Sequence, residues 1–259
     1  MEHVVHSNRE TAYRLTGTDG DGPTTLYVHG SGGTHQVWVH QYAPRGPAHP
    51  AVALDLSGHG ESEDVETEPG PKTLSAYAAD VAAVARETDA DVLVGNSLGG
   101  AVVFEVLLEG HYEPRGVVLA GTGAKLAVHE TIRTLLREDF EAVVTLLHQE
   151  SRLFSEPDEQ LLASSKEALE SVGQAVTRRD YLTCHEFDVR DRLDEVDVPA
   201  LAVVGEHDTL TPPAYHEYLV ENLPDCQLAT VENAAHLAML EQPRAFNAAL
   251  DAFCDRLQG

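Results

Sequence analysis

The chain has 259 residues and a formal net charge of -26 at pH 7, so it can bury a full core but lacks the clustered Lys and Arg that duplex binding needs. No stretch approaches the roughly 20 consecutive apolar residues that cross a bilayer, and the first residues lack the basic-then-apolar order of a secretion signal, so we expect a cytoplasmic protein that does not enter the membrane. Three widely spaced cysteines, an odd number, favour neither a disulfide framework nor a zinc site.

Strand and helix patterns alternate along most of the chain. Two short strands within 4–16 end at a turn cluster rich in Gly and Asp, and later apolar runs are separated by stretches with helical periodicity. The further predicted strands are 24–28, 51–54, 92–95, 116–120, 200–204 and 226–231. The predicted helices are 36–42, 73–88, 98–109, 212–223 and 243–257. This alternation predicts an α/β fold with a mostly parallel sheet covered by helices on both faces.

The alternation stops between 123 and 198, where only helical periodicity remains. Apolar residues there recur at three- and four-residue steps: Leu136, Phe140, Val143 or Val144, and Leu147. We therefore expect a core formed by 1–122 and 199–259, with a helical insertion over 123–198.

A serine lies on a predicted tight turn between a strand and a helix. Residues 95–99 read GNSLG, and the turn lifts the hydroxyl of Ser97 clear of the backbone while leaving the next amide free. This pattern is typical of a nucleophile elbow. The other interpretation is that Ser97 only caps the following helix.

An acid and a histidine follow the serine in the order that a catalytic triad of this kind requires. Asp208 comes after the strand at 200–204, and His236, one of fourteen histidines, lies on a loop before the last helix. We predict that His236 is the base and that Asp208 orients it. Asp208 could instead be a loop residue or cap the helix near 212, and Glu206 and Asp188 are the reserve candidates for the acid.

The oxyanion of an acyl-transfer reaction needs two preorganised donors. The backbone amides of Leu98, after the predicted nucleophile, and of Ser31, in the loop HGSGG at 29–33, are the candidates, although that loop could also be a flexible glycine turn. The chain has no complete G-x-G-x-x-G, G-x-x-x-x-G-K or H-E-x-x-H pattern, so we predict neither a cofactor nor a metal.

Five segments together resemble the capped α/β-hydrolases across nearly the whole length of the chain: HGSGG at 29–33, DLSGHGES at 55–62, GNSLGG at 95–100, GEHD at 205–208 and AAHLAMLEQP at 234–243. The resemblance implies that the insertion is a cap over the active site. Members that open epoxides or remove halides generally carry an aspartate at the elbow, so Ser97 favours acyl transfer to water.

We predict a serine hydrolase that cleaves a small or medium acyl ester through an acyl-enzyme. GNSLGG and HGSGG are also similar to hydrolases that cleave carbon-carbon bonds in ring-fission products, but those enzymes usually have tryptophan where this chain has Leu237. Transfer of the acyl group to an alcohol or thiol, and a receptor that keeps the fold without catalysis, are further alternatives.

Arginines in the insertion leave an acidic ester or a lactone open as the substrate, although most of them are expected to pair with surface acids. They are Arg133, Arg137, Arg152, Arg178, Arg179, Arg190 and Arg192. The expected partner is a small acyl substrate, and neither the natural substrate nor the oligomeric state follows from the sequence.

The acidic surplus is spread along the chain, and only three of the 17 basic residues are lysine. This composition resembles that of proteins from extreme halophiles, and an ordinary acidic protein is the alternative. Such a surface repels itself in dilute buffer, because charges are screened over about 10 Å at 0.1 M salt but only about 3 Å at 1 M.

Overall fold

The computed structural model describes residues 1–17, 20, 22–42 and 49–258. These residues form one eight-stranded sheet in the order β1-β2-β4-β3-β5-β6-β7-β8. The strands are β1 (Glu2–His6), β2 (Arg9–Thr16), β3 (Thr25–Val28), β4 (Ala51–Leu54), β5 (Val92–Asn96), β6 (Gly116–Ala120), β7 (Ala200–Gly205) and β8 (Cys226–Val231). β1 and β2 are antiparallel to their neighbours, and all other pairs are parallel, so the predicted α/β fold with a mostly parallel sheet is confirmed.

Helices cover both faces of the sheet because successive strand residues point to opposite sides. In β3, Leu26 and Val28 pack into one apolar cluster, whereas Tyr27 packs into the other with Trp38. The first cluster includes side chains of α2 (Pro71–Thr88), α3 (Leu98–Leu108) and α8 (Pro213–Asn222). The second lies under η1 (His35–Trp38), α1 (Val39–Tyr42), α9 (Ala238–Glu241) and α10 (Pro243–Gln258).

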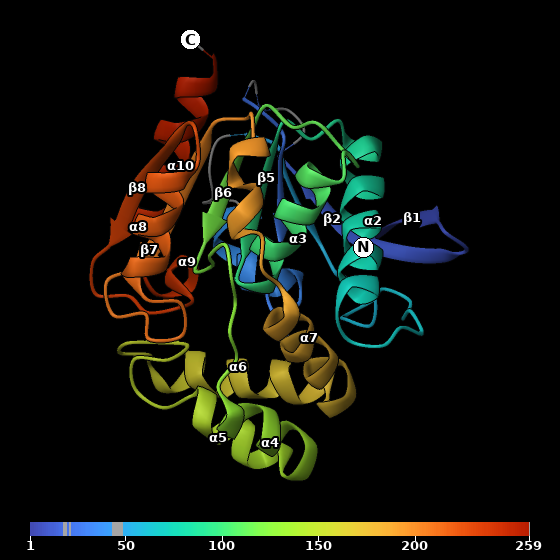
Figure 1. Ribbon diagram of the computed structural model, residues 1–259, viewed down its shortest axis with the longest axis vertical. Helices are drawn as coiled ribbons and strands as arrows, with labels where there is room; N and C mark the ends of the chain where they lie inside the picture. The colour runs from blue at the N-terminus through green and yellow to red at the C-terminus, as the bar shows by residue number, and fades with distance from the viewer. Residues whose placement is uncertain (18–19, 21, 43–48, 259) are drawn as a thin grey trace.

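Four helices form a cap at one end of the molecule, away from the C-terminus (Figure 1). They are α4 (Glu130–Glu138), α5 (Phe140–Leu147), α6 (Glu159–Val172) and α7 (Gln174–Glu186). Their inner faces share a small apolar cluster that contains Leu136, Val143 and Leu147, so the helical periodicity of this segment reflects a core of its own. The short 3-10 helix η2 (Arg190–Glu195) then leads back to β7.

The predicted helix at 36–42 differs in detail from the structure. A 3-10 turn, η1, precedes a single α-helical turn, α1. The side chain of Thr34 accepts a hydrogen bond from the Gln36 amide, and the His35 amide donates to Asp55 Oδ1 at 2.7 Å. These two contacts fix the first turn, which is short and tight as 3-10 segments usually are.

Within the described residues, no helix combines the length and apolar character that crossing a bilayer requires.

Candidate active site

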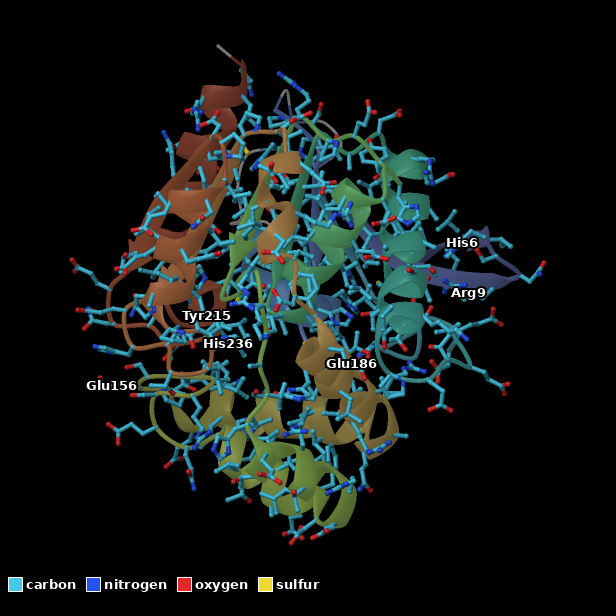
Figure 2. The ribbon with its side chains drawn as sticks, viewed as in Figure 1. His6, Arg9, Glu156, Glu186, Tyr215 and His236 are labelled. Atoms are coloured by element: carbon cyan, nitrogen blue, oxygen red, sulfur yellow. The ribbon has the colours of Figure 1, made fainter. Side chains whose placement is uncertain are left out.

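The three residues of the predicted triad follow the carboxyl ends of three strands in the parallel part of the sheet. Ser97 comes directly after β5, Asp208 shortly after β7 and His236 after β8. Parallel strands place these ends at one edge of the sheet, which is where α/β proteins bind their ligands. Figure 2 shows His236 and Tyr215 near this edge, where the core meets the cap.

Ser97 lies on a strained turn that its glycine neighbours permit. Its backbone angles are φ 55° and ψ -116°, a region that residues other than glycine seldom adopt. A Cβ atom at Gly95 would overlap the carbonyl oxygen of Gly99, and one at Gly99 would lie 2.7 Å from the carbonyl oxygen of His29. The Ser97 side chain makes no capping hydrogen bond to α3, so it does not act as the helix cap that the sequence left open.

Asp208 and His236 are joined by a hydrogen bond of 2.9 Å between Oδ2 and Nδ1. The other carboxylate oxygen accepts the amides of Leu210 and Thr211 at 2.8 and 2.9 Å, and the Thr211 hydroxyl donates to Oδ2 at 2.7 Å. Burial alone raises the pKa of Asp208, but the charge and hydrogen bond of His236 and the donors of Thr211 outweigh it, so the pKa lies below its usual value.

An ionised Asp208 at this position fixes the tautomer of the neighbouring ring. Because a carboxylate only accepts, His236 Nδ1 must carry a proton, and in the neutral ring Nε2 is then free to accept one. One Asp208 oxygen thus binds loop amides and the other contacts the histidine, whereas α8 begins at Pro213 without a side-chain cap from Asp208.

The two reserve acids lie elsewhere. Asp188 is exposed and pairs with Lys125 at 3.0 Å and Arg190 at 2.8 Å. Glu206 is half-exposed and accepts the amide of Asn233 at 3.3 Å.

The loop at 29–33 packs directly on the serine turn. A Cβ atom at Gly30 would lie 3.0 Å from the Cβ atom of Ser97, and the Gly33 amide donates to the Gly30 carbonyl at 3.1 Å to close the turn. In the described part of the chain, neither the Ser31 nor the Leu98 amide donates to another protein group. Both amides are therefore available to a ligand that lies beside Ser97.

The His29 ring supports this loop in its neutral form. Nδ1 lies 2.9 Å from the Gly30 carbonyl, to which it can donate, and Nε2 accepts the Leu56 amide at 3.0 Å. Burial and the nearby charge of His59 lower the pKa of His29 to about 4.

A buried network that the sequence analysis missed joins the cap to this loop. Asp180 of α7 accepts the Gly32 amide at 2.9 Å and His59 Nε2 at 2.9 Å through Oδ2, and it accepts the Tyr77 hydroxyl at 2.7 Å through Oδ1. His59 Nδ1 also faces an acceptor, the Ser57 carbonyl, at 3.2 Å. Both ring nitrogens therefore donate, which requires the imidazolium form.

The His59–Asp180 contact is an ion pair with both side chains fully buried. Burial lowers the pKa of His59, but the charge and hydrogen bond of Asp180 prevail, so this pKa is raised. The DLSGHGES motif pointed to the segment with His59, but its partner lies 121 positions later on a helix with no distinctive pattern. No local signal could have paired them.

Two cavities adjoin the serine turn, with volumes of about 500 and about 670 Å³. They share Ser31, Ser97, Tyr181 and His236 in their walls. The smaller cavity extends between the start of α4 and the loop before α8, and the larger one extends along α6 and η1. A ligand beside Ser97 would thus have two adjoining spaces to occupy.

No cluster of three or more His, Cys, Asp or Glu side chains suited to a metal ion occurs among the residues that the structure describes.

Comparison with known proteins defines the class. Residues 26–249 match the model of the alpha/beta hydrolase family, so the chain belongs to that family. It is similar to the pimeloyl-[acyl-carrier protein] methyl ester esterase of Neisseria meningitidis, with 31% identity over 235 residues, 85% of this chain and 73% of the relative.

It is also similar to 3-oxoadipate enol-lactonase 2 of Acinetobacter baylyi, with 25% identity over 91% of this chain and 90% of that protein. The solved structure of a thermophilic esterase superposes with a TM-score of 0.86 and 28% identity, over 99% of this chain and 97% of that one. The protein is therefore an α/β-fold hydrolase with esterases among its relatives.

Proposed function

We propose that this hydrolase cleaves a small or medium acyl ester through an acyl-enzyme formed on Ser97. The observation that supports this most directly is the hydrogen bond of 2.9 Å between Asp208 and His236, a histidine that lines the same cavity as Ser97. A serine hydroxyl is a poor nucleophile at neutral pH and needs a base that a third group orients.

In the proposed reaction, His236 Nε2 takes the Ser97 proton as Oγ attacks the ester carbonyl carbon. The amides of Ser31 and Leu98 stabilise the oxyanion that forms. His236 then gives the proton to the departing alcohol, which leaves the acyl group on Ser97. A water molecule, deprotonated by the same nitrogen, attacks the acyl-enzyme and releases the carboxylic acid, and Ser97 regains its proton.

The names of two relatives support acyl-oxygen cleavage over carbon-carbon cleavage. By their names, the Neisseria relative is an esterase and the Acinetobacter relative an enol-lactonase, and a lactone is a cyclic ester. Carbon-carbon cleavage has less support, because Leu237 stands where such enzymes usually have tryptophan.

Hydrolysis of p-nitrophenyl esters of increasing acyl length tests the proposal. We expect Ser97→Ala to reduce kcat by about 10³-fold or more, because the nucleophile is lost while binding and the oxyanion donors remain. Ser75→Ala is the matched control, since this exposed serine of α2 contacts Glu105 and should leave turnover unchanged. Near-normal ester turnover by a folded Ser97→Ala protein would refute the mechanism.

A further inference from the structure

The side chains that line the smaller cavity lack the acidic surplus of the rest of this protein. The chain carries 43 acidic residues, yet none of the described residues that line this cavity is Asp or Glu. Its wall contains one permanently charged side chain, that of Arg152, together with Ser97 and His236. The larger cavity differs, because Asp158 lies in its wall and its arginine, Arg14, stacks over the Tyr42 ring at 5.4 Å.

The backbone around Arg152 is fixed against the loops of the candidate triad. The His236 amide donates to the Arg152 carbonyl at 3.2 Å, and the Leu237 amide donates to the Leu153 carbonyl at 2.9 Å. The Ser151 carbonyl accepts the Thr209 amide, next to Asp208, at 3.2 Å. Arg152 is therefore held beside the reacting groups by the main chain, which is the preorganisation that a binding residue requires.

The charge of Arg152 has no partner in the described part of the chain. Three other arginines of this region are neutralised: Arg179 pairs with Asp64, Arg190 with Asp188 and Arg192 with Glu109. Arg152 makes neither an ion pair nor a side-chain hydrogen bond with the residues described, although it is partly buried.

The charge of Arg152 also acts on the hydroxyl of Tyr181, a residue that lines the same cavity. Burial raises the pKa of the Tyr181 hydroxyl, and Arg152 acts in the opposite direction. A partly buried guanidinium that none of the described acids neutralises is suited to a bound anion, and its planar fork can donate two hydrogen bonds to one carboxylate.

We propose that Arg152 is a specificity residue that binds a carboxylate carried by the substrate, so that the enzyme prefers esters with a free carboxylate over neutral esters of the same shape. This inference rests on the proposed ester hydrolysis and adds the substrate class. A protein with a charge of -26 repels anions at long range. A carboxylate therefore binds near Ser97 only if a local cation, not already neutralised by a described acid, offsets that repulsion.

The test compares the kcat/KM of two matched pairs of esters. Monomethyl glutarate and methyl glutaramate differ in charge at the end of the acyl part. The pair 3-acetoxypropionate and 3-acetoxypropionamide differ in charge at the end of the alcohol part. We expect the wild-type enzyme to prefer the anion by about tenfold to a hundredfold in one of the two pairs, as for other hydrogen-bonded charges. The preferred pair identifies which part of the ester enters the smaller cavity.

Arg152→Gln should bring this ratio to about one, and Arg152→Lys should keep only part of it, because a lysine presents a point charge without the fork. The ratio is measured within a single preparation, so partial misfolding of a variant affects both esters equally. Arg137→Gln is the matched control, since Arg137 is an exposed arginine of α4 outside the cavity wall, and its ratio should equal that of the wild type.

A wild-type ratio near one in both pairs, with normal turnover of the neutral esters, would overturn the carboxylate site while leaving the proposed hydrolysis intact. A preference that persists in Arg152→Gln would also overturn it. Absence of Ser97-dependent turnover of every ester would instead refute the proposed function.

Discussion

We predict that the buried pair of His59 and Asp180 contributes strongly to the stability of the fold. Asp180→Asn removes the negative charge, and its single remaining acceptor oxygen cannot serve the Gly32 amide, His59 and the Tyr77 hydroxyl as the carboxylate does. Both side chains of the pair are fully buried, so solvent does not screen the loss. Breaking a buried ion pair costs about 3–5 kcal/mol of unfolding free energy, and we expect a value in this range.

The cost should depend on pH in a defined direction. In the wild type, the raised pKa of His59 makes its contribution complete below about pH 6.5, the unfolded value, and the contribution is lost as the pH rises through the folded pKa. In Asp180→Asn, burial and the charge of Arg179 lower the pKa of His59, and only the hydrogen bond to the Ser57 carbonyl opposes them. We therefore expect His59 to fold in its neutral form and the variant to lose stability as the pH falls below about 6.5. The difference between the two proteins should therefore be larger at about pH 5.5 than at about pH 9.

Urea denaturation at these two pH values measures the difference. Asp188→Asn is the matched control, because it removes an exposed acid whose surface pairs are worth about 1 kcal/mol or less. A destabilisation by Asp180→Asn below about 1 kcal/mol, or one that does not change with pH, would refute the assignment of a buried imidazolium-carboxylate pair.

Two further predictions concern the serine turn and the surface. Gly99→Ala should lower the unfolding free energy by about 1–3 kcal/mol and remove most of the ester turnover, because the new Cβ would press on the carbonyl oxygens of Val28 and His29 and displace the elbow. Gly110→Ala, at a glycine with no atom within 4 Å of the new Cβ but with a φ of 65°, should lose about 1–2 kcal/mol from backbone strain and still keep its turnover. An equal loss of turnover in both variants would contradict the steric argument. If the acidic surface is an adaptation to salt, the midpoint of thermal unfolding should rise between about 0.1 M and about 2 M KCl, and a flat or falling midpoint would exclude it.

The order of strands and turns along the chain could be predicted from the sequence, because each of them depends on residues close together in the chain. The apolar runs at 24–28 and 200–204 gave buried strands, and the glycines at 95 and 99 marked the turn that holds Ser97. Both signals can be read within a few residues, since a short apolar run bounded by turn residues indicates a buried strand and glycines on either side of a serine indicate a tight turn. The fold class and the segments that surround the site followed from these patterns alone.

The selection among candidate acids required the tertiary structure. Asp208, Glu206 and Asp188 have the same chemistry, and only the packing of β7 beside β8 places Asp208 rather than the others against His236. The spacing of residues in the sequence does not determine which of several side chains after a strand contacts the histidine ring.

The network of Asp180 and the unpaired charge of Arg152 were likewise decided by the fold. The sequence gives seven arginines in the cap region without distinguishing them, and their roles depend on which acids the folded chain brings near each one. Contacts between residues 121 positions apart, such as His59 with Asp180, form only after the cap helix docks on the core, because no local backbone geometry encodes them. The sequence by itself determined the framework and the residues available for chemistry, whereas the tertiary structure decided which of those charges meet a partner among the described residues, because such contacts depend on how distant segments pack.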